Sequence, residues 1–177
     1  MKKTISIIIL FISFIITYFL QANFFSWFTI AGIQPNLFII LVLFVGLYAG
    51  MKVSIPYGVT IGVILDIIMG KTIGIYTIMY GAIAIAAGYL DKNFSKDSRF
   101  TFIVMIIVVT AILEIINYIL NIVIFSTSVE IISFCKVLSI EIIYNSILTI
   151  ILYPIMQTLG YKLENIFKAQ KVLTRYF

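Results

Sequence analysis

Apolar residues follow one another along this chain in six long runs that are separated by short polar segments. The runs cover residues 4–20, 36–54, 56–70, 74–90, 101–125 and 132–158. A helix needs about 20 residues to cross the hydrocarbon core of a bilayer, so the pattern predicts an all-α integral membrane protein with a six-transmembrane-helix bundle. The third run offers only about 15 residues, or roughly 22 Å of helix. It is therefore expected to lie partly within protein, or to thin the bilayer around it.

Proline and glycine mark the ends of several predicted helices. Pro35 and Pro56 stand at the starts of the second and third runs, and proline is tolerated in a first helical turn. Gly70 and Gly74 enclose a short segment that predicts a tight turn. Pro154 falls inside the sixth run, where it should kink the helix because its ring nitrogen has no hydrogen to donate.

Composition supports burial in a bilayer. Apolar residues make up 63% of the chain, charged residues make up 11%, and the mean hydropathy is +1.19. A soluble protein of this length needs more polar surface, so residues 1–177 are predicted to form a single membrane domain. The chain has no His and one Cys, Cys135, which excludes an internal disulfide and the usual His/Cys metal sites. Cys135 is expected to pack as a small apolar residue.

Basic residues favour one side of the predicted membrane domain. When the N-terminus is placed in the cytoplasm, only Lys71 and Lys136 of the 12 Lys and Arg residues fall outside. Basic loops remain on the cytoplasmic side, so both termini are predicted to be cytoplasmic (N-in/C-in). The same distribution explains the net charge of +5 without nucleic acid, because the basic residues lie between apolar runs.

The first apolar run has two interpretations. Residues 1–22 have the layout of a cleavable signal peptide, since Lys2 and Lys3 precede the run and Gln21 follows it. The run is long for a signal peptide and its flank is bulky and aromatic, which favours a retained transmembrane helix.

The last segment of the chain, residues 160–177, is predicted to be an amphipathic helix. Its apolar residues fall broadly on one side, and Lys168, Lys171 and Arg175 line another. Such a helix lies at the cytoplasmic interface in contact with anionic lipid. A docking strip for a cytoplasmic partner is the alternative.

Polar residues inside the last two runs need an explanation, because a carboxylate near the bilayer centre costs about 2.5–3.5 kcal/mol. On the fifth run these polar residues share one helix face, which carries Glu114, Asn117 and Asn121. On the sixth run they also share one face, which carries Glu141, Asn145 and Thr149. The two sets match in depth on antiparallel helices, so we expect them to hydrogen-bond face to face. Adhesion between the helices is the favoured interpretation. A polar pocket or a partner-docking groove is the alternative.

Asp66 lies near the end of the third run, four residues before Gly70 and close to Lys71. An ion pair or a cap for the neighbouring turn is one interpretation, and a binding role is the other. Small residues also recur at four-residue spacing on the second to fourth runs, which favours close packing of helices. The pairs are Gly46/Gly50, Gly58/Gly62, Gly70/Gly74 and Ala84/Gly88.

Sequence motifs of common enzymes are absent. The chain contains no nucleotide-binding glycine loop, no zinc-protease motif and no G-x-S-x-G nucleophile motif. We therefore predict a protein that is not an enzyme and that uses no cofactor or metal.

Three segments carry a resemblance to a known family. They read QPNLFIILVLFVGLYAG from Gln34, YGVTIGVILDIIMG with Asp66, and GIYTIMYGAIAIAAGYL from Gly74. In order, spacing and length the chain resembles the bacterial rod shape-determining protein MreD family over roughly residues 1–165. The P-N pair, the L-D-x-x-x-G turn and the G-x-Y that follows are the most telling parts.

The resemblance implies a non-enzymatic scaffold of the cell-elongation machinery in the bacterial cell membrane, with MreC, MreB and peptidoglycan synthases as partners beside membrane lipid. It also implies a bundle similar to the substrate-binding subunits of energy-coupling-factor transporters. Those vitamin binders supply an alternative function. Their usual Ala-x-x-x-Ala dock is absent from the first run, TISIIILFISFIIT, which counts against transport.

Overall fold

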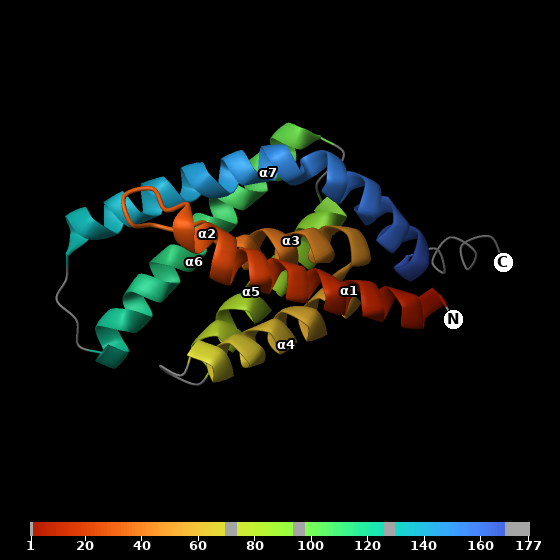
Figure 1. The fold of residues 1–177 in the computed structure, drawn as a ribbon. Coiled ribbons are helices and arrows are strands. Elements are labelled where there is room, and N and C mark those ends of the chain that lie inside the picture. Colours follow the sequence, from red (N-terminus) through yellow and green to blue (C-terminus); the bar gives the residue numbers. More distant parts are fainter. Residues whose placement is uncertain (1, 70–73, 94–97, 126–129, 169–177) are drawn as a thin grey trace.

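The computed structural model describes residues 2–69, 74–93, 98–125 and 130–168, and these ranges are helical nearly throughout (Figure 1). The elements are α1 (Lys2–Phe19), the π-helix η1 (Leu20–Phe24), α2 (Phe25–Trp27), α3 (Leu37–Ala49), α4 (Met51–Met69), α5 (Ile75–Asn93), α6 (Arg99–Phe125) and α7 (Ile131–Phe167). Six of them are long, and the described residues form no β-strand. The prediction of an all-α protein with six long helices is thus confirmed.

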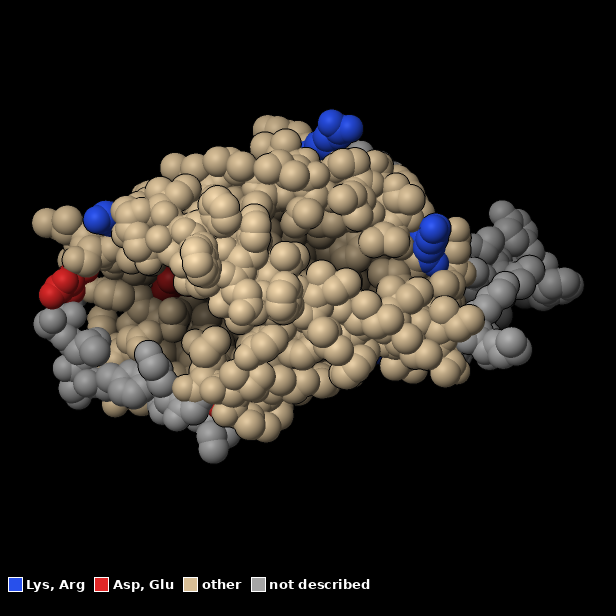
Figure 2. All heavy atoms as spheres, in the orientation of Figure 1, with Lys and Arg blue, Asp and Glu red and all other residues tan. Residues whose placement is uncertain are grey.

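Four helical stretches among the described residues are long and apolar enough to cross a membrane: Thr4–Trp27, Met51–Met69, Arg99–Ile124 and Ile131–Phe167. The apolar helices Leu37–Ala49 and Ile75–Asp91 are shorter. Figure 2 shows a face of the molecule on which charged side chains are sparse and stand apart, as expected of a surface that contacts lipid.

The short helix α3 forms the centre of the bundle. Every one of its residues except Leu41 is buried. It packs against α1, α4, α5, α6 and α7. A helix of 13 residues is about 20 Å long, too short for the hydrocarbon core. Because protein encloses α3 on all sides, it has no need to match the thickness of the lipid.

The boundary between the second and third predicted spans differs from the prediction. The helix breaks at Gly50, whose φ of +81° suits glycine, instead of next to Pro56. Residues 51–55 therefore belong to α4, which has 19 residues. The short helix is α3, so the expectation of a short third span was wrong. Pro56 lies inside α4 instead of in its first turn.

Glycines bring α4 and α3 close to α5. A Cβ atom added at Gly58 would lie 2.6 Å from the carbonyl oxygen of Tyr80. A Cβ atom added at Gly62 would likewise be too close to the backbone of Thr77, and one added at Gly46 would be too close to Ala87. At Gly88 an added Cβ would lie 2.7 Å from Cβ of Met51. Gly50 and Gly74 differ, because their positive φ values place them at helix ends, and Gly70 lies outside the described residues.

The last helix is longer than predicted. α7 runs unbroken from Ile131 to Phe167, so residues 160–167 continue the sixth span and do not start a separate amphipathic helix. The axis of α7 bends in its second half, where Pro154 lies (Figure 1). The bend directs the end of α7 toward the starting end of α1 (Figure 1).

Candidate functional site

A non-helical segment enters the bundle just before α3. Its backbone polar groups need partners, because water is scarce inside a membrane protein. Gln21, held in the π-helix η1, donates from Nε2 to the carbonyl of Pro35 at 2.7 Å. Its Oε1 accepts the N–H of Leu37 at 3.0 Å. Asn36 caps α3 by accepting the N–H of Ile39 at 3.4 Å.

Asn145 on α7 completes this arrangement from the other side. Its side chain is fully buried, and its Oδ1 accepts the backbone N–H of Asn36 at 2.8 Å. Its Nδ2 donates to Thr110 Oγ1 on α6 at 3.2 Å. The hydroxyl of Tyr80 on α5 donates to Asn36 Oδ1 at 3.1 Å. We call Asn36, Tyr80, Thr110 and Asn145 the amide junction, since they join four helices.

Two carboxyl groups lie one helical turn from the amide junction. Glu141 precedes Asn145 by four residues on α7, is 6% exposed, and has no hydrogen-bond partner for Oε1 within the described part of the chain. The carboxyl groups of Glu114 and Glu141 are close enough to interact directly. Tyr76 and Tyr80 of α5, whose stacked rings have centroids 6.3 Å apart, lie within electrostatic range of the pair. Figure 2 shows acidic side-chain atoms inside a recess of the surface.

The predicted matching of α6 with α7 is reproduced at some positions and not at others. Glu114 meets Glu141, and Asn145 bonds to Thr110, which fits antiparallel helices in contact. The amides of Asn117 and Asn121 bond within α6 instead, because Asn121 Nδ2 donates to the carbonyl and to Oδ1 of Asn117 at 2.7 and 3.0 Å.

Asp66 is the cap of a neighbouring helix. Its side chain is 2% exposed and lies opposite the first turn of α5, where Gly74 has no side chain to cap the helix. Oδ1 accepts the N–H of Tyr76 at 2.9 Å. Oδ2 accepts the N–H and the hydroxyl of Thr77 at 3.1 and 2.6 Å. A carboxylate at a helix N-terminus also meets the positive end of the helix dipole.

Lys168 lies at the opposite end of the bundle, where it is paired within the chain, and its contact with lipid or a partner stays a prediction. Its ammonium group donates to Asp91 Oδ1 at 2.5 Å and to the carbonyl of Leu47, in the last turn of α3, at 3.1 Å. Glu164 lies at 3.5 Å. The ion pair thus ties the ends of α3, α5 and α7 together. The other predicted tail contacts, Lys171 and Arg175, lie outside the described residues.

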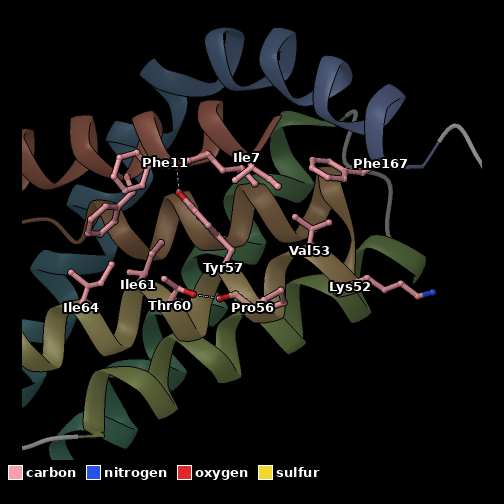
Figure 3. A pocket seen from close by; sticks show the side chains of 12 residues that line it. Ile7, Phe11, Lys52, Val53, Pro56, Tyr57, Thr60, Ile61, Ile64 and Phe167 are labelled. Atoms are coloured by element: carbon pink, nitrogen blue, oxygen red, sulfur yellow. Dashed lines mark hydrogen bonds between the residues drawn. The ribbon is translucent and has the colours of Figure 1, made fainter. Parts of the chain in front are cut away.

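A groove of about 430 Å³ separates α1 from α4 (Figure 3). Tyr57 spans it from α4, and its hydroxyl donates to the carbonyl of Leu10 on α1 at 3.0 Å. Ser13 Oγ lies 3.0 Å from the same hydroxyl. Phe167 of α7 closes one end, and Lys52 stands beside it with its ammonium group directed away from the groove (Figure 3).

Sequence reasoning missed three members of these contacts. The sequence pattern marks Gln21 only as the flank of a possible signal peptide, and it gives no role to Tyr80 or Thr110. Each is a polar side chain in or beside an apolar run, which is the one signal that was available. Among the residues that the structure describes, no three His, Cys, Asp or Glu side chains lie together in a way that could hold a metal ion.

Comparison with protein-family models gives a match that covers residues 1–163 and is described as rod shape-determining protein MreD. The chain belongs to the MreD family. Its role is therefore in rod-shape determination, and its long apolar helices make it a membrane protein. No curated protein and no solved structure matches, so the expected likeness to transporter subunits has no support from these comparisons.

The residues that carried the resemblance to the MreD family occupy the polar contacts of the bundle. Pro35 and Asn36 form the segment held by Gln21 and by Asn145. Asp66 caps α5, and Tyr76 is one of the residues whose N–H it accepts. The most telling parts of the resemblance thus coincide with polar contacts between helices.

Proposed function

We propose that this protein is a non-enzymatic scaffold of the bacterial cell-elongation machinery, and that it holds MreC, MreB and peptidoglycan synthases together at the cell membrane. The observation that carries the proposal is the family match over residues 1–163, because that family is described by shape determination. The named partners come from the resemblance of the sequence to this family.

The use of buried polar groups supports a scaffold. Asp66 and Asn145 each bind backbone N–H groups of another part of the chain, and Lys168 binds a carbonyl group. These side chains fasten helices to one another. These contacts make the bundle rigid, and a scaffold that binds several partners requires a rigid structure.

The orientation belongs to the same proposal, with both termini in the cytoplasm. Lys52 and Lys168 lie together where the start of α4 meets the ends of α5 and α7, at the end of the bundle where α1 also begins (Figure 1). We call this the basic end and place it at the cytoplasmic surface, following the preference of basic residues for that side.

Co-purification from native membranes in mild detergent tests the scaffold. The tagged protein is isolated, and bound proteins and small molecules are identified from the same sample, with an unrelated six-helix membrane protein carrying the same tag as the control. Recovery of MreC and wall synthases with the tagged protein alone is expected. A vitamin-sized ligand recovered together with an ATP-driven transport module would overturn the scaffold.

A thiol-labelling experiment tests the orientation. Cys135 is replaced by Ala, and a new cysteine is introduced as Ser133→Cys near the start of α7 or as Lys162→Cys near its end, at two exposed positions. In intact cells a membrane-impermeant maleimide should label the first variant only. Labelling of the second variant alone would reverse the proposed orientation.

A further inference from the structure

The groove between α1 and α4 has no part in the function proposed above. Its walls are hydrocarbon, with Ile7 and Phe11 on the α1 side and Val53 and Ile64 on the α4 side (Figure 3). The hydroxyl groups along it are already bonded within the chain, since Thr60 donates to the carbonyl of Pro56 at 2.7 Å. An occupant therefore meets an apolar surface and needs no polar groups along its length.

The groove lies on a side of the bundle that faces lipid. Beside it, Ile8 and Ile12 of α1 are 52% and 48% exposed, and Val59 and Val63 of α4 are 37% and 42% exposed. The two helices that form its walls are both long and apolar enough to cross a membrane. A groove between two such helices runs in the direction of the lipid acyl chains.

A single charge marks one end of this groove. Lys52 is the only charged residue that lines it, is exposed, and has no acidic partner among the described residues. The neighbouring Lys168 is different, because Asp91 already pairs with its ammonium group. A lysine at the edge of a membrane domain holds its ammonium group in the headgroup layer, where an anionic phosphate is its natural partner.

We propose that the groove is a binding site for one anionic phospholipid, whose acyl chain lies between α1 and α4 and whose phosphate pairs with the ammonium group of Lys52. The apolar walls fit the chain, and the position of the charge fits the headgroup.

Native mass spectrometry of the full chain tests this site. The detergent-purified protein is titrated with phosphatidylglycerol or with phosphatidylcholine of the same acyl chains. The first bound lipid should favour phosphatidylglycerol by about fivefold, as expected from one lysine beside an anionic headgroup. Lys52→Gln should remove this preference and Lys52→Arg should keep it. The control Lys162→Gln alters an exposed lysine of α7 that does not line the groove, and it should bind as the unchanged protein does.

A second variant tests the apolar walls. Thr60→Trp places an indole ring in the groove from an exposed position, and it should reduce the first lipid adduct severalfold for both lipids. Unchanged thermal midpoints identify variants that keep the fold. Equal binding of the two lipids, or an undiminished preference in Lys52→Gln, overturns the proposal. A protein dimer that Thr60→Trp dissociates would instead assign the groove to a second copy of the chain.

Discussion

Asn145 on α7 binds the backbone N–H of Asn36 at 2.8 Å, although 109 residues separate the two in the sequence. The bond satisfies a donor at the start of α3, the helix that all the other long helices surround. Without this bond, the buried N–H would have no water molecule to donate to instead, which is energetically costly. The contact therefore links the most buried helix to the last one in the chain.

Asn145→Leu should destabilise the bundle. The change leaves the N–H of Asn36 without a partner and removes the bond to Thr110, so we expect a loss of about 1–3 kcal/mol in unfolding free energy. The thermal midpoint of the purified protein measures it. Asn121→Leu is the matched control, because the bonds of Asn121 among the described residues stay within its own helix, and the change should alter the midpoint little.

Asp66→Ala should loosen the start of α5. It leaves the N–H groups of Tyr76 and Thr77 without acceptors, at a cost of about 1–3 kcal/mol. Thr77→Val removes only the hydroxyl contact and should lower the thermal midpoint less. Equal midpoints for Asp66→Ala and the unchanged protein would show that this cap does not contribute to stability.

Gly58→Ala should disturb the contact between α4 and α5, because the added methyl group would lie 2.6 Å from the carbonyl oxygen of Tyr80. Overpacking of this kind costs about 1–3 kcal/mol. Gly81→Ala is the matched control, since its methyl group would lie 3.4 Å from Val59 Cγ2, at an ordinary contact distance. The control should leave the thermal midpoint unchanged or raise it, since alanine favours helix. Similar midpoints for both variants would contradict the close approach.

Replacing Glu114 and Asn117 together by Leu tests the adhesive interpretation of the polar face on α6. If the carboxyl and amide groups hold α6 against α7, the double variant should melt at a lower temperature than the unchanged protein. An unaltered midpoint would exclude adhesion as their main role. Binding measurements on the pair Glu114 and Glu141 would then be the next step.

Lys168→Met should weaken the basic end of the bundle, because Asp91 and the carbonyl of Leu47 both lose their donor. The ion pair is mostly buried, with side chains 23% and 14% exposed, so we expect a loss of about 1–2 kcal/mol. Lys168→Arg should recover part of it. Lys162→Met alters an exposed lysine six residues earlier and serves as the control. A double variant with Asp91→Asn that adds no further loss would assign the effect to the ion pair.

Hydropathy was sufficient to predict six long helices and to show that Asp66, Glu141 and Asn145 require partners. It did not identify those partners, since contacts such as Asn36 with Asn145 depend on which helices become neighbours. The length of α3 was missed for a related reason. An apolar sequence indicates that a helix is shielded from water, but it does not indicate whether lipid or protein covers the helix. The helix is apolar on every side, which fits enclosure by protein and contact with lipid equally well.

The dependence of α3 on a side chain of α7 has a consequence for biosynthesis. The ribosome completes α3 well before it reaches Asn145, so the backbone N–H of Asn36 waits for its acceptor until the final helix is made. Nascent chains that stop before α7 therefore carry an unfinished centre. We therefore expect chains that end before α7 to be less stable in the membrane than the completed protein.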